Sequence, residues 1–291
     1  MTNAGRILIT GATGTVGGAV LDRLGGAGAD VRVLTRDTSK ARALRDRGVE
    51  AAVADFLRPE TLAPALEGAR VIFLLTPISS EQVAQATNVI TVARQTGQSP
   101  RIVRVSVQKA AHDAPTRVGR QHARVEDVLR ASGLPHTLLR PQSFMQNTLT
   151  AAPTVRAEGT IYQPCKDGRL AMIDARDVGE VAAKVLVDPG HDGQVYTLTG
   201  PAAVSFHDVA GALSEALGAD VRYVDIPPAA AQAALLRRGV SAWLADALIE
   251  YAEAHSQGYS DYTTDDVPRL TGHPATPYAR FARDFAPHFR G

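Results

Sequence analysis

Cysteine is almost absent from this chain, since Cys165 is the only one among 291 residues. A single cysteine excludes an internal disulfide and any zinc site built from several cysteines. It also favours a reducing compartment over an oxidising one.

An excess of one charge and long hydrophobic runs are missing as well. The net charge is +1 and the basic residues form no block, which gives no electrostatic support for binding nucleic acid. No apolar run approaches membrane-spanning length, and no signal-peptide pattern precedes the first predicted strand. We therefore expect a cytoplasmic protein with neither nucleic acid nor a membrane as partner.

The chain instead has a regular alternation of short apolar runs and helical periodicity. Strands are predicted at 6–10, 31–35, 49–53, 70–75, 101–105 and 136–140, and helices between them, for example at 81–95 and 119–131. Repeated strand–helix–strand units predict an α/β fold of the Rossmann type, with a doubly wound parallel sheet.

This rhythm breaks after Pro141. Later strands are predicted at 169–173 and 194–198, and helices at 205–217, 229–237 and 240–254. We expect an NAD(P)-binding domain over residues 1–150, with a returning segment near 169–187, and a smaller, mostly helical substrate-binding region over 151–291. The pattern near Gly239 to Ala254 suggests exposed helices that are candidates for a homodimer contact.

A glycine motif joins the first strand to the first helix. Gly11, Gly14 and Gly17 follow the spacing G-x-x-G-x-x-G. Such a turn lets the backbone approach a pyrophosphate, which the N-terminus of the following helix attracts. The candidate cofactor residues here are Gly11, Thr13, Gly14, Thr15 and Val16.

The end of the second strand bears on the choice of nucleotide. An acidic residue there would accept hydrogen bonds from the ribose hydroxyls of NAD, but the chain has Arg36. Its guanidinium suits a 2′-phosphate, and Lys40 adds a second positive charge. The pattern therefore favours NADP(H), although Asp37 leaves NAD open and both cations also fit a solvated helix start.

Ligands of open parallel sheets bind beyond the carboxyl ends of the strands, so the residues that follow the other strands are also candidates. Asp55 and Phe56 are candidates for adenine, although Asp55 is equally suited to cap the helix near Pro59. The residues expected beside the nicotinamide are Leu75, Thr76, Pro77, Ser106, Pro141 and Phe144.

Several motifs together resemble the NmrA-like branch of the atypical short-chain dehydrogenase/reductases, in particular its quinone oxidoreductase and triphenylmethane reductase types. They are Gly11-Ala12-Thr13-Gly14, Val33–Arg36, Ala54-Asp55-Phe56, Val105-Ser106, His122-x-x-x-Glu126, Ser132–Pro141, Phe144–Asn147 and Asp174–Val178. The resemblance covers most of the chain and implies a reductase or a cofactor-binding regulator.

The chain departs from the wider superfamily at its usual Tyr-x-x-x-Lys motif. Alignment on Glu126 puts Val118 at the tyrosine and His122 at the lysine. The usual proton donor is therefore absent, which disfavours ordinary alcohol dehydrogenation. A quinone is less demanding, because its reduced form is a stabilised aromatic oxyanion.

His122 and Ser106 are the candidate catalytic residues. His122 is suited to hold the nicotinamide ribose or relay a proton, or else is a surface histidine paired with Glu126. Ser106 is suited to orient a substrate oxygen or to cap the next helix. The sequence has no metalloprotease or nucleophile motif, so we expect no metal.

An apolar substrate wall is predicted after the sixth strand. Its members are Phe144, Met145, Asn147, Ile161 and Gln163, although the same residues would also suit a core. The main prediction is an NADPH-dependent reductase of quinones or conjugated aromatic carbonyl compounds that uses no flavin. The alternatives are an NAD(P)-sensing regulator without turnover and a biosynthetic ketoreductase whose substrate assists its own protonation.

Overall fold

The computed structural model describes residues 5–290, which divide into two compact units. Unit 1 comprises the chain up to Ala114, Gly119–Arg140 and Val178–Thr197. Unit 2 comprises Pro115–Val118, Pro141–Asp177 and the chain from Leu198 onward. The boundary expected at residue 150 thus lies inside unit 2, and the segment that returns to unit 1 begins at Val178.

Unit 1 is built on a seven-stranded sheet in the order β3-β2-β1-β4-β5-β6-β8. The strands are β1 (Arg6–Thr10), β2 (Val31–Thr35), β3 (Glu50–Val53), β4 (Ala69–Leu74), β5 (Arg101–Val105), β6 (His136–Pro141) and β8 (Val195–Leu198). Neighbouring strands from β3 to β6 pair in parallel. The strand order reverses between β1 and β4, which is the switch point of a doubly wound fold, so the predicted fold class is confirmed.

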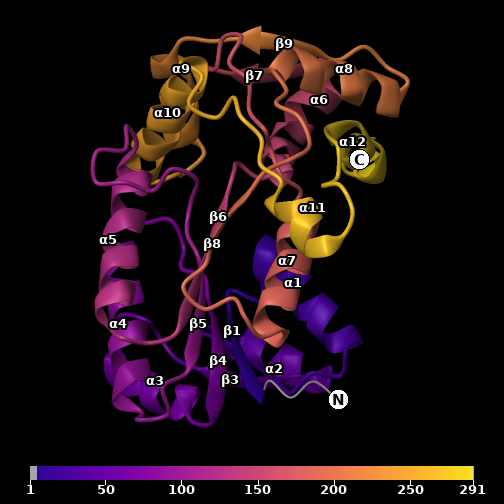
Figure 1. Cartoon of the computed structure of the whole chain (residues 1–291). Helices are drawn as coiled ribbons and strands as arrows, with labels where there is room; N and C mark the ends of the chain where they lie inside the picture. Colours follow the sequence, from indigo (N-terminus) through magenta and orange to yellow (C-terminus); the bar gives the residue numbers. More distant parts are fainter. Residues whose placement is uncertain (1–4, 291) are drawn as a thin grey trace. The chain divides into compact units, whose positions relative to one another are not determined.

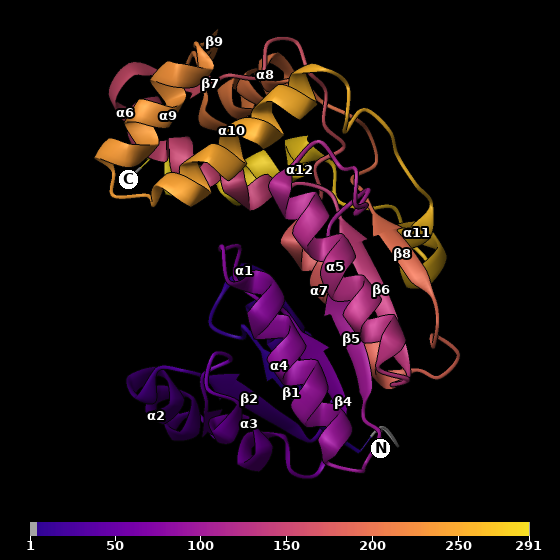
Figure 2. The same cartoon turned by 90° about the vertical axis from the view of Figure 1, so that its left-hand side faces the viewer.

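Helices cover both faces of this sheet (Figure 1). They are α1 (Thr15–Gly26), α2 (Thr38–Asp46), α3 (Pro59–Leu66), α4 (Gln82–Gln95), α5 (Arg117–Ala131) and α7 (Ala175–Val187). Helices α3, α4 and α5 lie on one face, seen from their own side in Figure 2. Their apolar stripes supply residues such as Leu62, Val89 and Leu129 to a core that includes Ile72 of the sheet.

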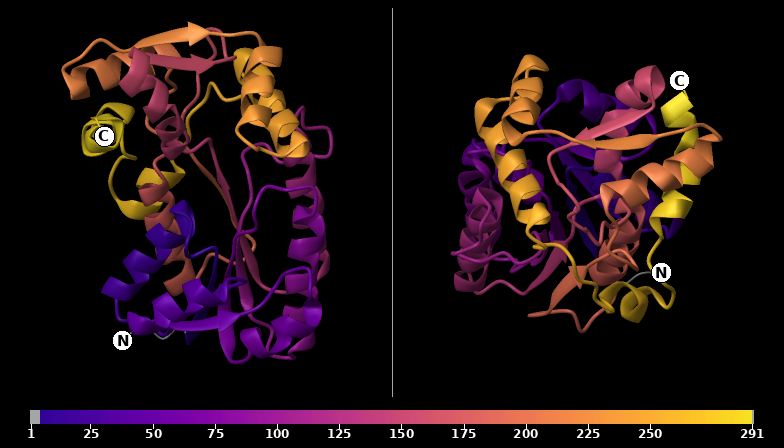
Figure 3. Two further views of the ribbon diagram at one scale, coloured as in Figure 1. Left: turned by 180° about the vertical axis from the view of Figure 1, so that it is seen from behind. Right: turned by 90° about the horizontal axis from the view of Figure 1, so that it is seen from above.

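Unit 2 has a small sheet of its own, in which β7 (Thr160–Gln163) pairs in parallel with β9 (Arg222–Asp225). Figure 3 shows these two strands side by side from behind and from above. The sequence did not predict either strand. The strand expected at 169–173 is wrong, because this segment makes only isolated bridges, Leu170 to Val204 and Ile173 to Phe144.

Most of unit 2 is helical, as predicted. Its remaining elements are η1 (Met145–Ala151), α6 (Ala152–Glu158), α8 (Phe206–Leu217), α9 (Pro228–Arg237), α10 (Ala242–Ser256), α11 (Asp266–Thr271), α12 (Tyr278–Asp284) and α13 (Ala286–Arg290). Phe281 and Phe289 of the last two helices are buried in a core with Leu213 of α8. Within residues 5–290, no helix combines the length and the apolar character needed to cross a bilayer.

Candidate functional site

The glycine turn between β1 and α1 is shaped to admit a phosphate. Gly11 has a φ of +69°, which favours glycine, and its carbonyl accepts a hydrogen bond of 2.9 Å from the Gly14 N–H. Gly14 is the N-cap of α1 and gives it no side-chain cap. A Cβ at Gly17 would lie 2.2 Å from the Gly11 carbonyl oxygen. The helix therefore packs so closely against the turn that there is no room for a side chain at this position.

The side chains of this turn differ in their access to a ligand. Thr13 and Thr15 are exposed, whereas the Val16 side chain is buried in the core. Val16 can therefore reach a ligand only through its backbone. The uncapped start of α1, together with the glycine backbone, fits the pyrophosphate of a dinucleotide.

The end of β2 carries two exposed basic side chains, and the carboxylate of its acidic residue already accepts hydrogen bonds from the start of α2. Arg36 and Lys40 are both exposed. Asp37 is the N-cap of α2, and its carboxylate accepts from the N–H groups of Ser39 and Lys40 at 2.8 and 3.1 Å. The Ser39 hydroxyl and the Lys40 N–H lower the pKa of Asp37. Because the Asp37 carboxylate already accepts these hydrogen bonds, it is poorly placed to bind the ribose hydroxyls of NAD. This supports the prediction of NADP(H).

The end of β3 keeps Asp55 and Phe56 together. Asp55 accepts from the Leu57 N–H at 2.9 Å in a local turn. It does not cap α3, whose N-cap is Arg58, so that alternative is wrong. Phe56 packs partly against the core, and its carbonyl accepts from Asn88. Both residues thus remain half-buried at the strand end predicted for adenine.

The end of β4 is tied to the glycine turn. The Thr10 hydroxyl accepts from the Leu75 N–H at 2.7 Å and lies 2.9 Å from the Leu75 carbonyl oxygen. The Leu75 side chain also packs against the turn, since a Cβ on Gly11 would lie 3.0 Å from it. Thr76 is buried and Pro77 is exposed. The structure therefore brings the predicted Leu75–Pro77 segment next to the predicted phosphate turn.

A buried arginine that the sequence analysis missed holds this segment. Arg104 on β5 is completely buried and donates to the Leu74 carbonyl at 3.1 Å and to the Thr76 hydroxyl at 3.0 Å. Burial lowers the pKa of Arg104 to about 9, partly offset by the Glu126 carboxylate. The sequence signal for this role was an arginine within the apolar run Arg101–Val105. A guanidinium on a buried strand needs several hydrogen-bond acceptors, so such an arginine is expected to bind neighbouring oxygen atoms.

Ser106 belongs to a second buried network centred on Glu126. The Ser106 hydroxyl donates to Glu126 at 2.6 Å, and Arg140 and Arg130 donate to the same carboxylate at 2.9 Å each. Because its proton is committed to Glu126, Ser106 is not placed to donate to a substrate oxygen in this geometry. It also does not cap α5, whose first residue is Arg117.

His122 is buried in α5, only 5% exposed, so the alternative of a surface histidine paired with Glu126 is wrong. Its Nε2 lies 3.2 Å from Nε2 of Gln82, and its Nδ1 has no hydrogen-bond partner among residues 5–290. Burial, followed by the positive charges of Arg104 and Arg140, lowers the pKa of His122 well below its ordinary value. A neutral imidazole donates one hydrogen bond through its N–H and accepts one at its other nitrogen, but it carries no positive charge at neutral pH.

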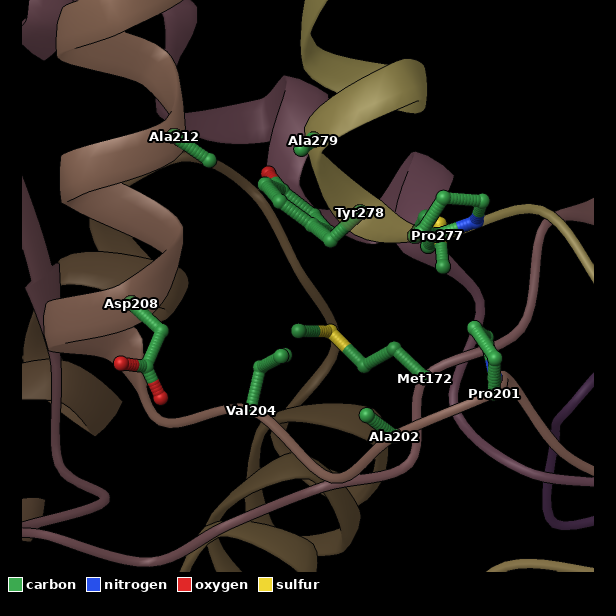
Figure 4. Close-up of a pocket in the computed structure, with 10 residues that line it drawn as sticks. Met172, Pro201, Ala202, Val204, Asp208, Ala212, Pro277, Tyr278 and Ala279 are labelled. Atoms are coloured by element: carbon green, nitrogen blue, oxygen red, sulfur yellow. The ribbon is translucent and has the colours of Figure 1, made fainter.

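The residues after β6 begin unit 2. Pro141 and Met145 are buried, Phe144 is half-buried, and Asn147 is exposed. Met145 helps to line a cavity of about 270 Å³ in this unit, also bounded by Met172, Val204 and Tyr278. Figure 4 shows Met172 and Val204 facing Tyr278 and Ala279 across it, with Asp208 at its edge. The lining is mostly apolar and suits an aromatic ring.

The strand β7 corrects part of the predicted substrate wall. Ile161 is only 1% exposed and packs in the core of unit 2, so the core alternative holds for this residue. The backbone carbonyl of Gln163 accepts from the Tyr223 hydroxyl at 3.0 Å, while its side chain is half-buried. The physical reason is that β7 pairs with β9, a strand that the sequence analysis did not anticipate.

Metal ligands do not gather anywhere in residues 5–290, where no group of three or more His, Cys, Asp or Glu side chains could hold an ion. Burial raises the pKa of the Cys165 thiol to about 12. At neutral pH this cysteine is therefore a protonated core residue rather than a nucleophile.

Comparisons with known proteins agree with this arrangement. The sequence model of the NmrA-like family matches residues 3–264. The chain is 38% identical to the NAD(P)H azoreductase of Xenophilus azovorans over 97% of this chain and 99% of that protein.

Two solved structures superpose over nearly the whole chain. The NADPH complex of the Escherichia coli quinone oxidoreductase covers 96% of this chain and 99% of its own, with a TM-score of 0.87 and 30% identity. The NADP(H) complex of the Citrobacter sp. triphenylmethane reductase covers 97% and 99%, with a TM-score of 0.86 and 25% identity. On these matches, the chain belongs to the NmrA-like family.

Proposed function

We propose that this chain is an NADPH-dependent oxidoreductase that reduces quinones or related conjugated aromatic compounds and uses no flavin. Three relatives that match nearly the whole chain are named as an NAD(P)H azoreductase, a quinone oxidoreductase and a triphenylmethane reductase. Azo compounds, quinones and triphenylmethane dyes are all extended conjugated molecules.

The cofactor would be held by unit 1 through contacts of three kinds. The turn Gly11–Val16 would bind the pyrophosphate through backbone N–H groups. Arg36 and Lys40 would bind the 2′-phosphate, and the Leu75–Pro77 segment would lie beside the nicotinamide ribose. When bound, NADPH supplies a hydride to the acceptor. Arg104 keeps the β4 end in place by holding Leu74 and Thr76.

The observation that carries the proposal is that α5 lacks the tyrosine and the lysine that are usual in the wider superfamily. Its residues at the positions of the usual tyrosine and lysine are Val118 and His122, both buried, and burial keeps His122 neutral. These two side chains supply neither an acidic proton nor a cation to an isolated alkoxide. An acceptor whose reduced form is a stabilised aromatic anion does not depend on them, and it can take its proton from water.

The test is NADPH consumption by the purified, flavin-free protein with a panel of quinones, azo dyes and conjugated ketones. Cofactor affinity is measured in the same samples from NADPH fluorescence. Saturable oxidation of NADPH with one class of acceptor supports the proposal and identifies the substrate chemistry. Tight binding of NADPH with no turnover on any acceptor would refute it and favour a cofactor-sensing regulator.

A further inference from the structure

A buried cation of unit 1 has no anion paired with it. Arg104 is completely buried, and the two groups that accept from its guanidinium, the Leu74 carbonyl at 3.1 Å and the Thr76 hydroxyl at 3.0 Å, are both uncharged. Its Nε has no hydrogen-bond partner among residues 5–290, and no carboxylate in that range forms an ion pair with it. Holding the end of β4 requires hydrogen-bond donors but no full charge, and a buried charge without a paired anion is costly.

The carboxylate whose charge acts on Arg104 is already used by other cations. The charge of Glu126 opposes the effect of burial on the pKa of Arg104. The same carboxylate accepts from Arg140 and Arg130 at 2.9 Å each. The Arg130 side chain is 47% exposed, so water screens much of its charge. Even without Arg130, the two cations Arg104 and Arg140 exceed the one anion Glu126, which leaves this part of unit 1 positively charged.

The neighbouring histidine responds to this excess of positive charge. The charges of Arg104 and Arg140 act in the same direction as burial and lower the pKa of His122. The imidazole therefore stays neutral and neither adds to the positive charge nor offsets it. The field of the two arginines extends beyond their own hydrogen-bond partners.

Arg104 lies next to the strand end at which unit 1 is predicted to bind the cofactor. The two groups that it holds, on Leu74 and Thr76, flank Leu75. The Leu75 side chain in turn packs against Gly11 of the phosphate turn, across the switch point between β1 and β4. Ligands of open parallel sheets bind at such a switch point, beyond the carboxyl ends of the strands. All of these residues belong to unit 1.

The oxidised and reduced cofactors differ in charge at their nicotinamide end. The nicotinamide ring is positively charged in NADP⁺ and neutral in NADPH, whereas the phosphates are the same in both. A fixed cation beside the ring therefore repels the oxidised form only. The repulsion is strong where water is excluded and is then weakly screened by salt.

We propose that Arg104 makes the cofactor site of unit 1 select NADPH over NADP⁺, because its buried positive charge disfavours a positively charged nicotinamide ring. The proposal rests on the proposed function, in which the Leu75–Pro77 segment lies beside the nicotinamide ribose. Arg104 is then a specificity-determining residue that acts through its charge and does not have to touch the cofactor.

This selection has a consequence for turnover. The acceptor takes a hydride, that is one proton and two electrons, and a positive charge is left on the nicotinamide ring. Arg104 thereby weakens the binding of the oxidised product and promotes its release. The site also binds NADPH in the presence of accumulated NADP⁺, so product inhibition by NADP⁺ is weak.

The first test is made on the wild type and needs no turnover. Isothermal titration calorimetry gives the Kd values of NADPH, NADP⁺ and 2′-phospho-ADP-ribose, which keeps the phosphates but lacks the nicotinamide. We expect NADP⁺ to bind about 10-fold or more weakly than NADPH, with a ratio of the two Kd values that changes little between low and high salt. Equal affinities for NADPH and NADP⁺ overturn the proposal without any variant.

The second test removes the charge in two ways. Arg104→Gln keeps an N–H donor for Leu74 and Thr76, whereas Arg104→Met keeps none. We expect both variants to bind NADP⁺ about 10-fold more tightly relative to NADPH than the wild type does, and Arg104→Gln to bind 2′-phospho-ADP-ribose as before. A shift of the ratio in Arg104→Met alone would assign the effect to the lost hydrogen bonds and refute the role of the charge.

The matched control is Arg101→Gln. Arg101 lies on the same strand at its other end and likewise donates to carbonyl groups, those of Leu186 at 2.7 Å and Asp188 at 3.1 Å. Its ratio of Kd values should equal that of the wild type, and thermal melting shows whether each variant is folded. The same shift of the ratio in Arg101→Gln and Arg104→Gln would refute the proposal.

The binding data separate this proposal from the proposed function. A wild type that selects NADPH but turns over no acceptor refutes the reductase and retains the role of Arg104 in recognising the oxidation state. A wild type that oxidises NADPH with a quinone but binds NADP⁺ equally well refutes the role of Arg104 and retains the reductase. Binding of neither cofactor refutes both.

Discussion

Two neighbouring glycines in α1 should respond in opposite ways to the same substitution. A Cβ on Gly17 would lie 2.2 Å from the Gly11 carbonyl oxygen, 2.5 Å from its carbon and 2.8 Å from the Ala12 nitrogen, all backbone atoms. A Cβ on Gly18 would have its nearest contact at 3.5 Å, to the Ala12 carbonyl oxygen, which is ordinary packing. The structure therefore predicts that Gly17→Ala disturbs the turn and Gly18→Ala does not.

The magnitudes follow from these distances. To bring the Gly17→Ala contact from 2.2 Å to about 3.4 Å, helix and turn must separate by about 1.2 Å. Alanine gains about 1 kcal/mol of helix propensity at either position, but overpacking of this kind costs about 1–3 kcal/mol. Gly18→Ala should be stabilised by up to ~1 kcal/mol and Gly17→Ala destabilised by up to ~2 kcal/mol. The same displacement moves the N–H groups of the turn, so Gly17→Ala should bind NADPH at least ~10-fold more weakly.

The assay is urea unfolding of both variants together with NADPH titration by fluorescence. Gly18→Ala serves as the control, since it adds the same methyl group one residue away in the same helix. If Gly17→Ala bound NADPH like the wild type and unfolded at the same urea concentration as Gly18→Ala, the close approach of α1 to the turn would not be what shapes the site.

Three further predictions concern charge. Arg36→Ala should weaken NADPH binding by about 1.5–3 kcal/mol, or roughly 10- to 150-fold, and leave NADH almost unaffected; equal losses for both cofactors in a fluorescence titration would contradict the 2′-phosphate role. Glu126→Met should destabilise the protein by roughly 3–5 kcal/mol in denaturant unfolding, because it leaves the Ser106 and Arg140 groups without their buried acceptor, and a loss below ~1 kcal/mol would argue against this network. The pKa of His255 is lowered to about 4 from 6.5 by burial, so its contribution to stability is present above pH 6.5 and is lost as pH falls through about 4. Melting temperatures between pH 7 and 4 should fall less steeply in His255→Gln, and parallel curves would contradict this.

Much of the Rossmann-type sheet was predictable because its signals are local. Apolar runs of the right length gave β1 to β6 within one or two residues, and the glycine spacing gave the turn at Gly11–Gly17. The second unit was predictable only in its helical character. The strand expected at 169–173 forms isolated bridges instead, because β-structure depends on a partner that is remote in the sequence.

The sequence by itself determined the fold class, the glycine turn and the cation at the end of β2, since each follows from local periodicity or from a residue's own chemistry. The tertiary structure alone decided which polar groups are buried together. It placed Arg104 against Thr76, Ser106 against Glu126, and His255 between Ser143 and Ser260, pairs separated by 20 residues or more in all but the last contact. Such pairings depend on the packing of distant elements, and the protonation of each buried group depends in turn on those neighbours.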